Sequence, residues 1–265
     1  MCKWRASLLI AWAIILVSCG PTDSQRTSDG GSIPRAAASE NGQPVLRVQN
    51  SHLSIDKGQT PLESMSPRWK RDLIDTTVGA EYLTESERQL IIEMNMVRSD
   101  PKAYAHWFLV PLRPLYHQTL IERPGEITVS THEGVRALDE CIKSLQGAKP
   151  VPPLTPKKGL TLGARDHARD QARTGDTGHT GSDGSTDDLR INRYGKWDIS
   201  AGENIDYGNK EPRRIVTSLL IDDGVPSRGH RANLLSESFK FVGVAMGPHR
   251  VYRQMCVMDF AGSYR

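Results

Sequence analysis

The stretch "FKFVGVAMGPHRVYRQMCVMDFAG", residues 239–262, decides the fold. It holds two runs rich in β-branched, aromatic and other apolar residues, 239–247 and 251–262, with the turn-forming letters "PHR" between them. Two such runs joined by a short turn predict an antiparallel pair of strands. The upstream stretch "ISAGENIDYG", 199–208, has the same character and predicts a third strand. The carboxyl-terminal part of the chain is therefore expected to form a small antiparallel sheet.

Helical signals dominate the chain before these strands. Two capping boxes of the form S/T-x-x-E, Thr84 with Glu87 and Ser130 with Glu133, predict the starts of two helices. The pattern of apolar residues and of proline and glycine predicts helices over 88–100, 101–108, 135–147, 158–175 and 211–224. Helices that do not alternate with single strands favour the α+β class, with the sheet layered against helices.

The composition is that of a soluble domain with a tail. The chain has 265 residues, of which 37% are hydrophobic and 25% are charged. Its formal net charge of +3 falls to +1 without Lys3 and Arg5, which lie in the segment that we expect to be removed. A balance so close to neutrality gives no support to a nucleic-acid partner.

The amino terminus has the features of an export signal. A short basic segment precedes the apolar run 8–17, which is too short to span a bilayer comfortably, although an uncleaved membrane anchor is the alternative. "LVSCG", 16–20, resembles a bacterial lipobox, in which cleavage precedes a cysteine that takes acyl chains. We therefore expect a lipoprotein signal peptide at 1–18, lipidation of Cys19, a disordered tether at 19–66 rich in Gly, Ser and Pro, and a globular domain at 67–265. The protein is expected to be exported and lipid-anchored in the cell envelope or outside the cell.

Two histidines and one glutamate each lie beside a glycine. His179 lies in "GDTGHTGSDGST", 175–186, a stretch without a single aliphatic side chain, Glu203 lies in the expected third strand, and His230 follows Ser227, which is expected to cap a helix. Glycine neighbours leave such side chains unobstructed. Imidazoles with a carboxylate suit a divalent metal ion, zinc rather than calcium, and suit a proton-handling pair equally well. Hydrogen-bonded histidines near turns remain the alternative.

Five motifs, in chain order, carry a family resemblance. "GHTGSDGST", "RYGKW", "GENIDYG", "SRGHRANLL" and "VYRQMCVMDFAG" are similar to the CAP superfamily, or SCP-domain proteins, which include cysteine-rich secretory proteins, venom allergens, plant pathogenesis-related proteins and bacterial secreted forms. The resemblance covers 81–264. It implies an α-β-α sandwich and a cleft with two histidines and two acidic residues. His179 and His230 match the histidines, and Glu203 matches the acid of the G-E-N motif.

The second acid of the family pattern is less directly matched. The family has W-x-x-E on the helix before the second histidine, whereas this chain reads "LLIDD", which makes Asp222 the nearest match and Asp223 the runner-up. Aspartate is one methylene shorter than glutamate. We therefore expect His179, His230 and Glu203 to be the direct metal ligands, and Asp222 to reach the metal only through water.

Three functions are compatible with this resemblance. The first is a binding module that holds a divalent metal and a small-molecule, lipid or protein ligand. The second is a metal-dependent hydrolase, such as a peptidase, with Glu203 and Asp222 as its catalytic acids. The third is a structural envelope protein. Neither H-E-x-x-H nor G-x-S-x-G occurs in the sequence, so binding is favoured over hydrolysis, although the sequence leaves open whether the protein is an enzyme.

The cysteines are even in number in the expected mature domain. Cys19 is assigned to lipid, which leaves Cys141 in an expected helix and Cys256 in the last expected strand. Two remaining cysteines in an exported protein predict a disulfide between them. Two buried free thiols are the alternative.

Overall fold

A computed structural model describes residues 69–265 of the chain. The expected signal peptide at 1–18, the lipidation site Cys19 and the tether at 19–66 lie outside the described residues. Within 69–265, no helix combines the length and the apolar character that crossing a bilayer requires.

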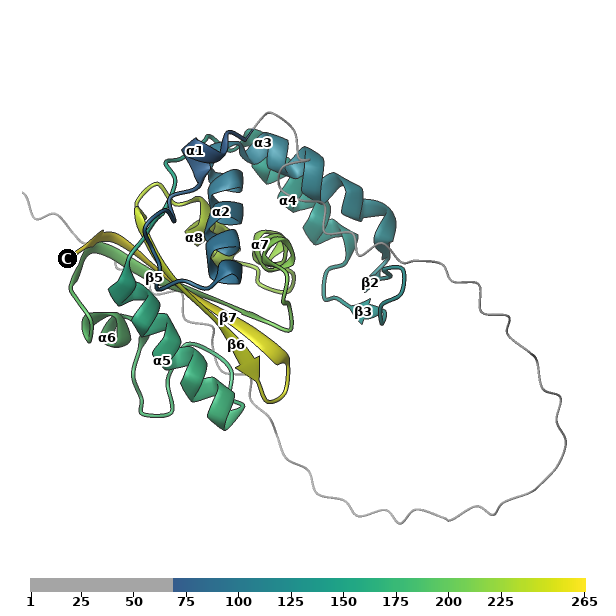
Figure 1. Ribbon diagram of the computed structural model, residues 1–265. Coiled ribbons are helices and arrows are strands. Elements are labelled where there is room, and N and C mark those ends of the chain that lie inside the picture. The colour runs from purple at the N-terminus through teal and green to yellow at the C-terminus, as the bar shows by residue number, and fades with distance from the viewer. Residues whose placement is uncertain (1–68) are drawn as a thin grey trace, which may run out of the picture. The chain divides into compact units, whose positions relative to one another are not determined.

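The centre of the domain is a four-stranded sheet (Figure 1). Its strand order is β4 (Thr155–Pro156), β6 (Phe241–His249), β7 (Arg253–Tyr264) and β5 (Trp197–Tyr207). The strands β6, β7 and β5 are antiparallel neighbours, while the short β4 runs parallel to β6. The three expected strands are therefore confirmed. The turn lies at 250–252 rather than 248–250, because β6 continues to His249, which pairs with Arg253.

Helices cover both faces of this sheet (Figure 1). The helices of the described chain are α1 (Arg71–Ile74), α2 (Glu85–Ser99), α3 (Pro101–Tyr104), α4 (Val135–Gly147), α5 (Lys158–Thr174), α6 (Asp187–Asn192), α7 (Pro212–Ile221) and α8 (Gly229–Leu235). After α3 come a π turn, η2 (Ala105–Leu109), a 3₁₀ segment, η3 (Val110–Leu115), and a small sheet of β1 (Tyr116–His117), β2 (Leu120–Ile121) and β3 (Val129–Ser130). The helices α5 and α6 lie on one face of the main sheet, and α2, α7 and α8 lie on the other. The α+β class and the α-β-α sandwich are confirmed.

The first capping box forms as the sequence predicts. The Thr84 side chain accepts the Glu87 N–H at 3.3 Å, and the Glu87 carboxylate accepts the Thr84 N–H at 2.8 Å. Asp100 then caps α3 by accepting the Ala103 N–H, with Pro101 at the first helical position. Both starts depend only on neighbours in the chain, which is why local sequence predicts them.

The start of α4 differs from the prediction. The helix begins at Val135, while Ser130 lies in β3, so the second capping box does not form. The carboxylate of Asp223 instead accepts the N–H groups of His132 at 2.6 Å and Glu133 at 2.7 Å. A carboxylate some ninety residues away in the chain thus holds the segment just before α4, and no local pattern reveals such a partner.

Small residues allow α5 to lie close against the sheet. Gly243 of β6 faces this helix, and a methyl group there would come within 2.1 Å of backbone atoms of Leu160 and Thr161. The apolar cluster between helix and sheet consists of Ala164, Ala168, Ile205, Ala245, Met255 and Val257. This tight layer fixes the end of α5, and with it the start of the loop that carries His179.

On the other face, the fully buried Arg98 of α2 ties loops together. Its guanidinium donates to four backbone carbonyls, those of Pro152, Leu234, Ser236 and Phe239. Burial lowers the pKa of Arg98 to about 10. These bonds fix the end of α8 relative to the sheet, and α8 carries His230.

The predicted disulfide is absent from the structure. Cys141 and Cys256 are both free and buried. The helix α4, which carries Cys141, packs against α7, and α7 in turn packs against the sheet, so Cys141 is one layer removed from Cys256 on β7. Burial raises the pKa of Cys141 to about 12 and that of Cys256 well above its ordinary value. Both residues therefore act as small apolar core residues.

Candidate functional site

The first histidine forms a pair with the strand glutamate. His179, in the loop after α5, places Nδ1 2.8 Å from Oε1 of Glu203 on β5. Burial alone would raise the pKa of Glu203, but the hydrogen bond from His179 and the charge of Arg190 lower it overall. An ionised carboxylate only accepts, so Nδ1 is the donor and Nε2 of the neutral ring carries the free lone pair. The same hydrogen bond raises the pKa of His179.

A buried arginine holds this pair in place. Arg190 of α6, whose side chain is 1% exposed, donates to Oε2 of Glu203 at 2.8 Å. It also donates to the backbone carbonyls of Ser185 at 2.7 Å and His179 at 3.0 Å. One guanidinium therefore joins the histidine loop to β5. Sequence reasoning missed Arg190, because nothing in "DDLRINRYG" distinguishes it from a solvated helix residue.

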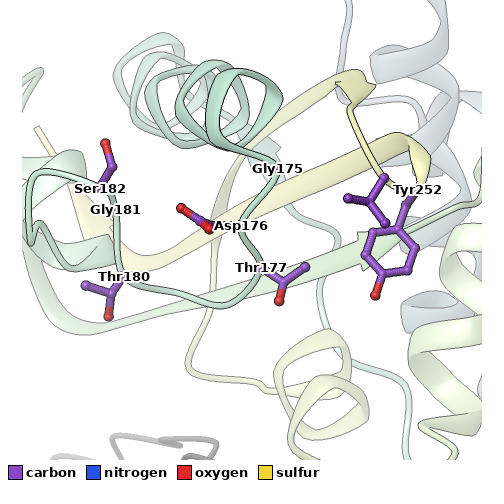
Figure 2. A pocket seen from close by; sticks show the side chains of 8 residues that line it. Gly175, Asp176, Thr177, Thr180, Gly181, Ser182 and Tyr252 are labelled. Atoms are coloured by element: carbon purple, nitrogen blue, oxygen red, sulfur yellow. The ribbon is translucent and has the colours of Figure 1, made fainter. Parts of the chain in front are cut away.

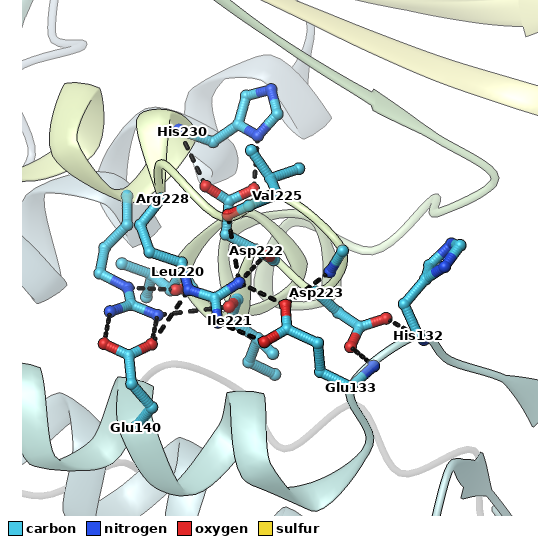
Figure 3. Close-up of polar contacts among 12 residues, drawn as sticks. His132, Glu133, Glu140, Leu220, Ile221, Asp222, Asp223, Val225, Arg228 and His230 are labelled. Atoms are coloured by element: carbon cyan, nitrogen blue, oxygen red, sulfur yellow. Dashed lines mark hydrogen bonds and ion pairs between the residues drawn. The ribbon is translucent and has the colours of Figure 1, made fainter. Parts of the chain in front are cut away.

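The second histidine has a carboxylate partner of its own. Nδ1 of His230 lies 2.6 Å from Oδ1 of Asp222, and the His230 backbone N–H donates to Oδ2 of the same carboxylate at 3.0 Å. Asp222 ends α7 in the left-handed conformation, with φ of 56°. Asp223, the runner-up, points away and binds the backbone of His132 and Glu133, just before α4 (Figure 3). The acid that meets the second histidine is therefore Asp222.

The turn between α7 and α8 is held by an arginine, and the expected cap at Ser227 does not form. The residue before α8 is Arg228, whose φ of 52° is left-handed, and the helix start has no side-chain cap. The Arg228 guanidinium donates to the carbonyl of Asp222 at 2.7 Å and binds both oxygens of Glu133 at 2.7 Å (Figure 3). The Asp222 carboxylate, and not a hydroxyl at Ser227, accepts an N–H of the first turn of α8, and Arg228 holds the Asp222 carbonyl in place.

The two pairs are anchored on neighbouring residues of β5. Glu203 binds His179, and the side chain of Asn204 donates to the backbone carbonyl of His230 at 3.0 Å. Asn204 also accepts a hydrogen bond from Asn233 of α8 at 2.9 Å. β5 is an edge strand of the main sheet. We call the set His179, Glu203, Asp222 and His230 the β5 site.

The direct ligand set expected from the sequence differs from the geometry of the β5 site. Among residues 69–265, no three His, Cys, Asp or Glu side chains are arranged as ligands of one metal ion. Both oxygens of Glu203 are engaged, one by His179 and one by Arg190, so Glu203 orients a ring instead of offering a free ligand. Carboxylates that hold the far nitrogen of a histidine are the usual outer shell of a metal site. In both pairs the carboxylate lies against Nδ1 of the ring, which leaves Nε2 on the opposite edge of each imidazole.

A second carboxylate lies buried beside Glu203. Asp259 of β7 is the cross-strand neighbour of Glu203 and is fully buried, and its carboxylate oxygens have no hydrogen-bond partner other than the Glu203 carboxylate. Burial, and then the charge of Glu203, raise the pKa of Asp259 well above its ordinary value. Sequence reasoning missed it, although an aspartate inside the apolar run "MCVMDFAG" was a visible signal.

The family comparison agrees with the resemblance that the sequence motifs carry. The family model for CAP, the cysteine-rich secretory protein family, matches residues 129–260. Among solved structures, an outer surface protein from Borrelia burgdorferi is 21% identical, with 42% of this chain and 78% of that chain covered and a TM-score of 0.36. An extracellular protein containing an SCP domain, from Bacillus anthracis str. Ames, is 26% identical, with 42% of this chain and 34% of that chain covered and a TM-score of 0.36. No curated protein matches the chain. The family match includes all four residues of the β5 site, and the chain belongs to the CAP superfamily.

Proposed function

We propose that this protein is an exported CAP-domain binding protein that holds a divalent metal ion, zinc before others, at the β5 site. His179 and His230 would be the metal ligands, each through Nε2. The observation that carries the proposal is that both rings are bound by a carboxylate at Nδ1, at 2.8 Å and 2.6 Å. This arrangement selects the tautomer whose Nε2 lone pair is available to a metal.

The carboxylates and Arg190 contribute orientation and charge. Glu203 and Asp222 hold the two rings, and Arg190 compensates the buried charge of Glu203. A zinc ion bound there would supply a Lewis-acidic centre that attracts an oxygen of a further ligand. A small molecule, a lipid or a partner protein could provide that oxygen.

Binding is better supported than hydrolysis. A hydrolase of this type needs a carboxylate that is free to take a proton from water. Both oxygens of Glu203 are bound by His179 and Arg190, and both oxygens of Asp222 are bound by the ring and the backbone of His230. Both carboxylates are also buried. The complete set of two oriented histidines likewise favours a binding site over a purely structural domain.

Calorimetric titration of zinc into the purified domain tests the proposal. His179→Ala and His230→Ala should each abolish measurable binding, because each removes a ligand. Glu203→Gln and Asp222→Asn should weaken binding by about 10–100-fold, the usual effect of removing an outer-shell partner. A protonated imidazole cannot bind a metal ion, and the pKa of His179 is raised above its ordinary value of 6.5. As the pH is lowered, the affinity for zinc should therefore begin to fall while the pH is still above 6.5.

His106→Ala, at an exposed histidine of η2, is the matched control and should bind zinc as the unaltered protein does. Unchanged zinc affinity in both His179→Ala and His230→Ala would contradict the proposal.

Export and lipid tethering rest on "LVSCG" and the apolar run before it. Cleavage before Cys19 would leave acyl chains on the new amino terminus, and several buried chains give a firm membrane anchor. Mass analysis of the processed protein should find an acylated Cys19, and Cys19→Ser should release the protein from membranes. A mature chain that begins elsewhere and carries no acyl group would show that the motif is not used.

A further inference from the structure

A hollow lies between the loop that follows α5 and the turn that joins β6 to β7 (Figure 2). This open hollow has a volume of about 570 Å³, which is within the usual range for small-molecule sites. Its lining consists of Gly175, Asp176, Thr177, Thr180, Gly181, Ser182, Val251 and Tyr252. None of these residues belongs to the β5 site, although Thr177 and Thr180 lie on either side of His179 in the chain.

One buried histidine holds both walls of the hollow. Nε2 of His249 lies 2.9 Å from the carbonyl oxygen of Asp176 in the loop wall. Nδ1 of the same ring accepts the N–H groups of Val251 and Tyr252 in the hairpin wall, both at 3.2 Å. Since Nδ1 accepts, Nε2 carries the proton and donates to the Asp176 carbonyl. The two walls are therefore set relative to each other before any ligand arrives, which lowers the entropic cost of binding.

The hairpin wall presents an aromatic ring to solvent. Tyr252 is 47% exposed, and its ring packs against Tyr207 at 5.4 Å and His249 at 5.3 Å between centroids. Tyr207 is itself fixed, because its hydroxyl donates to Gln171 at 2.8 Å and accepts the Gly178 N–H at 2.9 Å. The exposed ring therefore has a rigid support behind it.

The loop wall presents hydrogen-bonding groups. The side chains of Asp176, Thr177 and Thr180 are exposed there (Figure 2) and provide a carboxylate acceptor and two hydroxyls that both donate and accept. No lysine or arginine is among the eight lining residues, although Arg173 donates to the hydroxyl of Ser182 at 2.9 Å. An acyl chain finds only Val251 and the ring of Tyr252 as apolar partners.

We propose that this hollow binds a neutral saccharide. A sugar ring has an apolar face of C–H groups that packs on an aromatic ring, and a rim of hydroxyls that both donate and accept hydrogen bonds. Tyr252 offers the ring, and the loop wall offers matching partners for the rim. The site is separate from the β5 site and does not depend on a metal ion.

The test uses the purified domain with EDTA present and neutral tetrasaccharides of glucose, mannose and N-acetylglucosamine as probes, followed by calorimetry and by backbone amide NMR. At least one probe should bind and shift the amides of 175–182 and 251–252. Tyr252→Ala should weaken that binding by at least about tenfold, because an aromatic contact and its buried area are lost. Tyr252→Phe should retain it, because the ring remains.

Trp107→Ala removes an aromatic residue that is equally exposed, at 51%, on η2, and should leave saccharide binding unchanged. The proposal is overturned if no probe binds, if Tyr252→Ala binds as the unaltered domain does, or if Trp107→Ala weakens binding as much. Binding of tetramethylammonium but of no saccharide would also overturn it, since a cation would then be the occupant. The EDTA makes a negative result here independent of the zinc titration.

Discussion

Arg190→Met is expected to lower the free energy of unfolding by about 3–5 kcal/mol, the usual cost of leaving one member of a buried ion pair without its partner. The Arg190 side chain is 1% exposed and is paired with Glu203, whose carboxylate would keep its charge in a buried place. Two backbone carbonyls would lose their donor as well. Methionine preserves most of the volume, so the loss reports charge and hydrogen bonds and not a cavity. Urea unfolding at neutral pH gives the value.

Arg193→Met is the matched control for this change. Arg193 pairs with Asp166 and Asp183, but its side chain is 40% exposed, so water can replace both carboxylates. A much smaller loss is expected, as is usual for surface ion pairs. Equal losses of stability in the two variants would contradict this account, because the buried Arg190–Glu203 pair would then contribute no more than the exposed pairs of Arg193.

Asp259→Asn is expected to stabilise the protein, and to do so more strongly as the pH rises. The pKa of Asp259 is raised in the folded protein from its ordinary value of 3.8, by burial and by the charge of Glu203. Above pH 3.8 the unfolded chain releases this proton and the folded protein keeps it, so the unaltered protein loses stability as the pH rises. The loss is up to about 1.4 kcal/mol per pH unit until the raised pKa is passed. Asparagine is neutral in both the folded and the unfolded state, so the Asp259→Asn variant does not lose stability in this way.

Unfolding of both proteins in urea from about pH 4 to about pH 8 measures this difference. The two should differ least at the acidic end, where the unfolded aspartate has only begun to release its proton, and should separate steadily above it. A gap that does not change with pH, or a variant that is less stable at the alkaline end, would show that Asp259 is ionised in the folded protein.

The elements that sequence predicted well depend on near neighbours. The strands β6 and β7 follow from residue type along each run, and the start of α2 follows from Thr84 and Glu87, three positions apart. The start of α4 could not be predicted, because the residues just before it, His132 and Glu133, are held by Asp223 from another helix end. The disulfide was predicted wrongly for a similar reason, because it depends on which layers of the fold the two cysteines occupy. An even number of cysteines says nothing about the layers in which Cys141 and Cys256 lie.

For the β5 site, the sequence predicted which residues are present but not the role of each. The order of motifs along the chain pointed to His179, Glu203, His230 and Asp222, and the structure places each histidine against one of the acids. The role of Glu203 could not be predicted from sequence, since it depends on Arg190 occupying the second carboxylate oxygen. The position of Asp259 beside Glu203 depends on the register between β5 and β7, which no motif encodes.

The most direct measurement is a long-range ¹H–¹⁵N NMR correlation spectrum of protein labelled at histidine nitrogens, recorded before and after one equivalent of zinc. Both His179 and His230 should appear as the tautomer protonated at Nδ1, because each Nδ1 lies within hydrogen-bond distance of a carboxylate. Zinc should then shift the Nε2 resonances of these two rings while their Nδ1 protons remain. Rings protonated at Nε2, or Nε2 resonances that do not respond to zinc, would contradict a metal site built from two carboxylate-held imidazoles.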